Sequence, residues 1–197
     1  MEYIPVIMRG ILITLLISFI SLSISVIPGY LAYMGKKSKV RILNLICTAY
    51  IELFEGIPII VQLFFVFYAL PLIAPILTFS SYATAIIVLT LNAIANMAGF
   101  VKSQVEDVKG QESSNINIKF AILSALLVLR RIIKYTSLLS ILGLTELFRS
   151  ANTIMSSTSN IYIIFIAIGI YLLLSIGLKI IYKGLKGKFF YIEMKEA

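Results

Sequence analysis

Histidine is absent from the sequence, aspartate occurs once, at Asp107, and cysteine occurs once, at Cys47. Without histidine the chain lacks the commonest general base and the commonest metal ligand. A single cysteine forms no internal disulfide and no thiolate metal cluster. These absences exclude most catalytic and metal sites, so we expect a protein that is not an enzyme and that uses no cofactor.

Charge is also scarce, because only 13% of residues are charged while 60% are hydrophobic. Soluble domains carry about a quarter charged residues. The charges are clumped, and none occurs in residues 10–35, 56–101 or 150–178. A membrane helix needs about 20 mostly apolar residues to cross a hydrocarbon core roughly 30 Å thick. The first and last stretches each accommodate one crossing, and the middle stretch accommodates two.

The net charge of +8 raises the question of nucleic acid, but its distribution indicates a membrane instead. Basic residues follow alternate ends of successive apolar runs: Lys36, Lys37, Lys39 and Arg41; Lys102, Lys109 and Lys119; Lys179, Lys183, Lys186, Lys188 and Lys195. Positive charge collects in cytoplasmic loops. We therefore expect a multi-pass protein of the cell membrane, with its N-terminus outside and its C-terminus in the cytoplasm. Its surroundings are the lipid bilayer, and no nucleic acid is expected.

The apolar pattern predicts an all-α helix bundle with about five crossings, forming one transmembrane domain over residues 1–197. The predicted crossings are residues 11–33, 41–73, 82–101, 132–148 and 161–178. Residues 120–129 are too few to span, and the cations Arg130, Arg131 and Lys134 that follow are placed at the cytoplasmic interface. The polar run 150–160 is predicted to be an external loop.

Several polar side chains fall inside the predicted spans. Thr14, Ser18, Ser21 and Ser25 share one helix face. They either bond their own backbone carbonyls or face a polar path. Buried polar groups in a span need partners, and a solute can be one. The candidates for lining a pathway are Gln62, Asn92, Asn96, Thr136 and Ser137. The two asparagines could equally bind helices together.

Glu52 and Glu55 lie three residues apart, so they share a helix face. A pair of carboxylates can serve acid–base chemistry, and a membrane-embedded enzyme is one hypothesis. An interfacial ion pair with the basic segment after residue 35 is the simpler role. A polar stretch, residues 102–119, begins a predicted cytoplasmic region, 102–131, which is either a docking place for a soluble partner or a solvated loop.

Residues 50–65, from Tyr50 to Phe65, closely resemble a signature of permease subunits of polar amino acid ABC importers, usually Tyr-x-Glu-x-Phe-Arg-Gly-Thr-Pro-Leu-Leu-Val-Gln. Further blocks resemble the same family in the same order, from Gly10 to about Ser150. They are Gly10 with Thr14-Leu15, then Leu89 to Asn92, Val108 to Gln111, Lys134 to Leu139, and Glu146-Leu147.

The resemblance implies a type I importer permease and a set of partners. These are ABC ATPase subunits, an identical or sister permease, and an extracytoplasmic binding protein that delivers a polar amino acid. It also implies an ATPase-coupling loop at Lys109, Gly110, Gln111, Glu112, Ser113, Ser114 and Asn115.

The chain departs from the family pattern at several positions. Glu55 stands where the family has arginine, and Gly99 stands where it has glutamate. Tyr135 replaces an aspartate, and the segment before Lys134 is shortened. Most departures fall on the coupling loop. The alternative hypothesis is therefore a diverged permease homologue that does not transport and acts as a structural or regulatory membrane partner.

Overall fold

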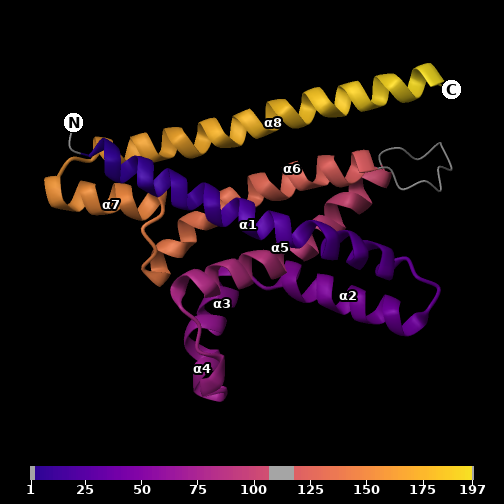
Figure 1. The fold of residues 1–197 in the computed structure, drawn as a ribbon, viewed down its shortest axis with the longest axis horizontal. Helices are drawn as coiled ribbons and strands as arrows, with labels where there is room; N and C mark the ends of the chain where they lie inside the picture. The colour runs from indigo at the N-terminus through magenta and orange to yellow at the C-terminus, as the bar shows by residue number, and fades with distance from the viewer. Residues whose placement is uncertain (1–2, 107–117, 197) are drawn as a thin grey trace.

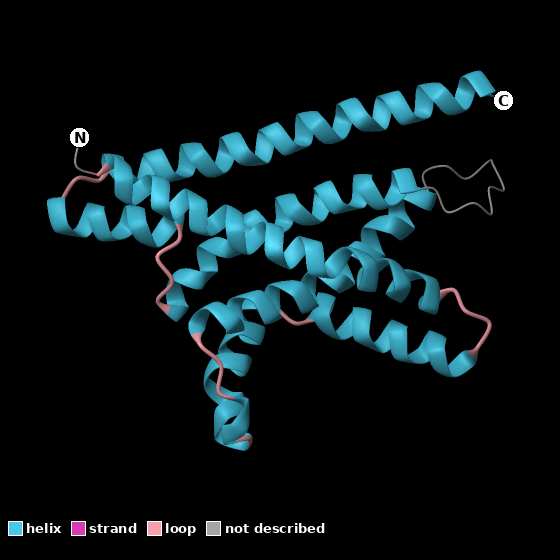
Figure 2. Ribbon diagram, in the orientation of Figure 1, coloured by secondary structure: helices cyan, strands magenta, loops and turns pink. Residues whose placement is uncertain are grey.

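The computed structural model describes residues 3–106 and 118–196, with side chains as far as residue 189. Within those ranges nearly every residue is helical and no strand occurs (Figure 2). The main helices are α1 (Ile4–Lys36), α2 (Arg41–Gly56), α5 (Ser81–Glu106), α6 (Ile118–Tyr135), α7 (Leu147–Thr158) and α8 (Tyr162–Glu196). The predicted all-α class is confirmed.

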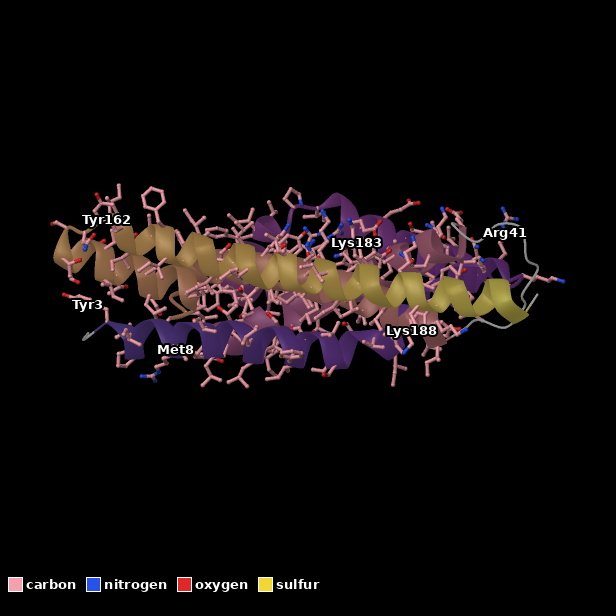
Figure 3. All side chains as sticks on the ribbon, turned by 90° about the horizontal axis from the view of Figure 1, so that it is seen from above. Tyr3, Met8, Arg41, Tyr162, Lys183 and Lys188 are labelled. Carbon is pink, nitrogen blue, oxygen red and sulfur yellow. The ribbon has the colours of Figure 1, made fainter. Side chains whose placement is uncertain are left out.

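The helices run mainly along the long axis of the molecule. The start of α1, α7 and the start of α8 lie at one end, and the α1–α2 turn and the end of α8 lie at the other (Figure 1). Seen from above, Tyr3 and Tyr162 mark the first end, while Arg41 and Lys188 mark the second (Figure 3). The basic segments around Arg41 and Lys188 therefore share one end, as the charge pattern predicts.

Three unbroken helices in the described ranges are long and apolar enough to cross a membrane: Ile4–Lys36, Ser81–Glu106 and Tyr162–Phe189. A fourth crossing is formed if Arg41–Gly56 and Ile59–Ile73, which meet at an angle of 99°, make one broken span. Helix α6 carries too many cations to qualify by composition, yet it packs along α1, α5 and α8. These lengths indicate a multi-pass membrane protein.

The centre of the bundle is the pairing of α1 with α5, the most extensive contact between helices in the described structure. Small residues allow it. A Cβ atom added to Gly29 would lie 2.5 Å from the Met97 Cβ and 2.9 Å from the Ile94 carbonyl oxygen. Close approach at small residues is how helices associate without a hydrophobic driving force between them.

The hydroxyl face of α1 is a packing surface. Thr14, Ser18, Ser21 and Ser25 are all fully buried. Ser18 donates to the Thr14 carbonyl at 2.7 Å, and Ser25 donates to the Leu22 carbonyl at 2.9 Å. The Thr14 hydroxyl accepts from the Leu147 N–H at 3.2 Å. Hydroxyls bonded in this way add little bulk, whereas the buried Ser21 hydroxyl has no partner among the described residues.

The predicted crossing at residues 132–148 is wrong, because α6 begins at Ile118 and ends at Tyr135. A 3₁₀ segment, η3 (Thr136–Leu142), follows, and Gly143 stops it with a φ of 83°. Arg130 donates to the Ser175 hydroxyl on α8 at 2.8 Å, so it has a partner within the bundle, and the interfacial placement of the three cations stays a prediction. A charge that is bonded inside the bundle does not need to lie at the membrane edge.

The predicted external loop at residues 150–160 is also wrong, because most of it is helix α7. Glu146 caps this helix, accepting from the N–H groups of Phe148 at 2.7 Å and Arg149 at 2.8 Å. The Tyr171 hydroxyl donates to the same carboxylate at 2.8 Å. Burial raises the pKa of the Glu146 carboxyl above its ordinary value, and these hydrogen bonds oppose the shift. Glu146 thus fastens α7 to α8.

After α2 the chain forms an apolar arm that projects from the bundle (Figure 1). The arm consists of α3 (Ile59–Phe64), a π-helical turn η1 (Phe65–Ala69), α4 (Leu70–Ile73) and the 3₁₀ turn η2 (Pro75–Leu77). Its tip is uncovered, with Leu72 85% and Ile76 92% exposed. A surface of this kind is stable only in contact with lipid or with another apolar surface.

Candidate functional site at a broken membrane helix

The site begins with a break between α2 and α3 that Pro58 dictates. Pro58 has no N–H, so the Phe54 carbonyl four residues earlier loses its helical partner. The residue before a proline is also driven out of the helical region, and Ile57 has an extended backbone with φ −89° and ψ 125°. The two helix axes therefore meet at 99°.

Side-chain amides replace the hydrogen bonds that the break removes. Gln62 donates to the Phe54 carbonyl at 3.0 Å and to the Ile57 carbonyl at 2.7 Å. Asn92, on α5, donates to the same Phe54 carbonyl at 3.0 Å. In an apolar surrounding an unbonded carbonyl costs several kcal/mol, so these amides stabilise the bend.

A second layer of polar groups connects α5 with α6. The Asn96 amide donates to the Asn92 carbonyl at 2.8 Å and to the Asn92 side-chain oxygen at 2.6 Å. The Arg131 guanidinium in turn donates to the Asn96 side-chain oxygen. It also stacks over Phe100, with 4.7 Å between the guanidinium carbon and the ring centroid. Arg131 is thereby held in place from two sides.

These groups surround one cavity of about 360 Å³, which we call the broken-helix pocket. Its lining residues are Phe54, Glu55, Ile57, Pro58, Ile59, Asn92, Asn96, Arg131 and Tyr135. Pockets for small molecules span roughly 300–1,000 Å³, mostly apolar with a few converging polar groups. The broken-helix pocket is of this size, and its polar groups come from α2, α5 and α6.

A second cavity of about 440 Å³ adjoins it toward the basic end of the molecule, and we call it the lysine pocket. It is lined by Tyr33, Lys36, Lys37, Ile51, Glu55, Ala98, Gly99 and Lys102. Glu55 lines both cavities. Its carboxylate fills the space that Gly99 leaves free, since a Cβ there would lie 2.7 Å from Oε1 of Glu55.

The structure brings together part of the predicted pathway lining. Asn92 and Asn96 line the broken-helix pocket. Gln62 is buried beside it and holds the break together. Thr136 is fully buried and donates to the Ile133 carbonyl, and Ser137 donates to the Lys134 carbonyl. Neither of these two hydroxyls lines the pocket.

Arg131 is the residue of the candidate site that sequence reasoning misses. The sequence places it at the cytoplasmic interface because the ten apolar residues before Arg130 are too few to span. The structure begins α6 at Ile118, so Arg131 lies 13 residues, about 20 Å, into the helix. The sequence signal that could have revealed Arg131 is the start of the helix. If the helix is taken to begin at residue 118, Arg131 lies at the same depth in the bundle as Asn96.

The predicted coupling residues lie outside the described ranges. They are Lys109, Gly110, Gln111, Glu112, Ser113, Ser114 and Asn115. The flanking helix ends are described: α5 ends at Glu106, where Lys102 and Glu106 form an ion pair at 3.9 Å, and α6 begins at Ile118. The predicted coupling region 102–131 is therefore helical at its start and again from residue 118.

Comparisons with known proteins bear on this arrangement. No family model matches the chain. The glutamine transport system permease protein of Escherichia coli K12 is 28% identical over 204 residues, covering 93% of this chain and 92% of that protein. A probable amino-acid ABC transporter permease of Bacillus subtilis is 34% identical over 111 residues, covering 56% of this chain and 48% of that protein.

A solved structure shows the same fold. One chain in the crystal structure of an amino acid ABC transporter with histidines superposes with a TM-score of 0.83 at 20% identity, covering 95% of both chains. The chain is a homologue of amino acid ABC transporter permeases. The resemblance found between Gly10 and about Ser150 in the sequence therefore extends to the fold of nearly the whole chain.

Proposed function

We propose that this permease homologue is the membrane-spanning subunit of an ATP-driven importer and forms the path for a polar amino acid. ATP hydrolysis belongs to separate ABC ATPase subunits, and an external binding protein delivers the amino acid. The broken-helix pocket is the observation that carries the proposal. In secondary transporters the substrate sites lie near the membrane midplane, at helices that are interrupted there, and we extend this rule to the importer.

The energetics of the pocket support a transport role. Asn92, Asn96 and Arg131 are polar side chains in the middle of an apolar bundle, and such residues are costly in a membrane unless they serve a polar solute or one another. Their mutual hydrogen bonds use only part of their capacity, because a guanidinium alone has five N–H donors. The unused donors face a cavity large enough for a small solute.

The second permease, identical or sister, completes the pathway in this proposal. We place the N-terminus outside and the C-terminus in the cytoplasm, since the basic segments around Arg41 and Lys188 share one end. The ATPase then docks at that end, where α5 and α6 are connected through the predicted coupling residues 109–115. ATP shifts the two access states only through contacts that differ between them.

Uptake into proteoliposomes tests the proposal. The chain is reconstituted with its ATPase, its binding protein and, where needed, the sister permease, and labelled amino acid uptake is measured with and without ATP. We expect ATP-dependent uptake, reduced at least tenfold in Asn96→Leu, which removes a polar group from the pocket. Ser137→Ala is the matched control outside the pocket and should transport normally.

Two results contradict the proposal. An assembled complex that hydrolyses ATP but moves no amino acid would leave the permease homologue without a transport function. Equal uptake by Asn96→Leu and Ser137→Ala would show that the path does not pass through the broken-helix pocket.

A further inference from the structure

The charged residues that line the broken-helix pocket indicate which class of amino acid it binds. We propose that Arg131 binds the α-carboxylate of the transported amino acid and that the pocket accepts neutral and acidic amino acids while rejecting cationic ones. This inference rests on the proposed transport function, because it concerns the same site.

Within the described part of the chain, Arg131 is a positive charge without a counter-ion. Its partners are an amide oxygen of Asn96 and the ring of Phe100. Among residues 3–106 and 118–189 no carboxylate lies within ion-pair distance of its guanidinium. A charge held in an apolar bundle is stabilised when an opposite charge reaches it. A bound carboxylate supplies that charge.

The geometry of the guanidinium suits a carboxylate. Its planar fork presents five N–H donors, and carboxylates accept two of them in parallel. The bond to Asn96 and the stacking on Phe100 fix the plane of the group before any ligand arrives. Such preorganisation reduces the entropy cost of binding. Arg131 can therefore orient a carboxylate inside the pocket.

Glu55 supplies the other half of the recognition. It lines the same pocket, and it rests over Gly99 rather than against Arg131. One cation and one carboxylate on separate parts of a pocket match the two charges of a zwitterion. The α-ammonium group of the substrate then faces Glu55 while its α-carboxylate faces Arg131.

A substrate with a cationic side chain has no further carboxylate to pair with in this pocket. Glu55 is the one carboxylate in the described lining of either cavity. The adjoining lysine pocket adds Lys36, Lys37 and Lys102, which repel a second positive charge. An extra negative charge meets no such barrier. The site therefore distinguishes amino acids by side-chain charge before it distinguishes them by shape.

Equilibrium binding to the detergent-purified complex of permease and ATPase tests the inference. The binding protein is left out, so that its own selectivity does not enter. The probes are labelled glutamine, glutamate and arginine, with glutamine α-amide, which lacks the α-carboxylate, as a competitor. We expect glutamine and glutamate to bind at least tenfold more tightly than arginine, and the α-amide to compete poorly.

Variants at Arg131 give the sharper comparison. Arg131→Gln should weaken glutamine binding at least tenfold. Arg130→Gln removes the same charge one residue away, where the side chain contacts Ser175 and not the pocket, and it should leave binding within twofold. Size-exclusion profiles confirm that each variant is folded.

The inference is overturned if arginine binds the unaltered complex as tightly as glutamine, or if the Gln variants at positions 130 and 131 behave alike. A complex that binds none of the probes is then assayed for ATP-driven uptake with its binding protein. Uptake in that assay refutes the carboxylate site and leaves the transport function intact. Absence of uptake refutes the transport function itself, and the inference falls with it.

Discussion

Two membrane segments of this chain bury polar side chains, and they use them in different ways. Helix α1 buries hydroxyls at Ser18 and Ser25, which bond carbonyls of their own helix and allow α5 to approach. The broken pair α2–α3 relies on the amides of Gln62 and Asn92, which both donate to the one carbonyl, of Phe54, that Pro58 has left without a partner. In α1 polarity serves packing, whereas at the break it replaces missing backbone bonds and leaves a cavity.

This contrast between α1 and the broken pair shows that polar residues in a membrane helix do not by themselves indicate a pathway. What separates the two segments is the backbone. In an unbroken helix the backbone N–H groups bond the carbonyls, so the side-chain hydroxyls are not needed for that purpose. A broken helix exposes carbonyls and recruits side chains from neighbours, and these side chains bring a polar cavity with them.

The largest effect is expected from crowding the α1–α5 contact. Gly29→Ala places a Cβ 2.5 Å from that of Met97, and overpacking of this kind costs about 3 kcal/mol. The free energy of unfolding of the detergent-solubilised chain measures it. Gly177→Ala, where no atom lies within 4 Å of the added Cβ, is the matched control. Equal stability of the two variants would mean that α1 does not pack closely on α5.

Removing the amide at the break comes next. Gln62→Met keeps the length of the side chain but withdraws two hydrogen bonds from the Phe54 and Ile57 carbonyls. The Phe54 carbonyl keeps its bond from Asn92, so the Ile57 carbonyl alone is left unbonded, which costs about 2 kcal/mol. Gln104→Met, which loses a bond to the Tyr182 hydroxyl instead, should cost less by the same unfolding measurement. A larger loss at Gln104 would contradict the role given to Gln62.

Restoring the backbone donor tests the break directly. Pro58→Ala returns an N–H to the Phe54 carbonyl, which favours a continuous helix and competes with Gln62 and Asn92. Its effect on the free energy of unfolding should be about 1 kcal/mol or less, while uptake in proteoliposomes should fall several-fold. Pro71→Ala, in the projecting arm, serves as control. Unchanged uptake in Pro58→Ala would separate the bend from transport.

The smallest effect is expected on the hydroxyl face of α1. Ser18→Ala removes a bond to a carbonyl of the same helix, so the free energy of unfolding should change by less than about 0.5 kcal/mol. Uptake should stay at the level of the unaltered protein. A strong transport defect in Ser18→Ala would show that the α1 face lines a path after all.

Much of the fold can be predicted from the sequence, because uncharged runs are strong signals. The stretches 10–35, 56–101 and 150–178 correspond to α1, to the projecting arm with most of α5, and to α7 with the first half of α8. Helix α7 cannot be recognised in the sequence, because its many hydroxyl and amide residues are typical of a loop. Only the cap at Glu146, with its three hydrogen bonds, identifies the helix start.

Only part of the candidate site can be predicted from the sequence, because its residues differ in how clearly they stand out from their neighbours. Asn92 and Asn96 stand out because they are amides in an apolar run. Arg131 does not, since a charge beside Arg130 and Lys134 is indistinguishable from an interfacial cluster until its partners are known. Those partners, Asn96 and Phe100, lie more than thirty residues away in the sequence. Long-range bonding decides whether a charge marks an edge or a site.

The contact between Arg130 and Ser175 bears on how the chain is made. Ribosomes deliver α6 to the membrane before α8 exists, because domains emerge from the N-terminal side first. Until the last helix arrives, the Arg130 guanidinium has no Ser175 hydroxyl to bond and remains a cost to insertion. Helix α6 therefore first packs against α1 and α5 without this bond, and the bond forms only once α8 has been made.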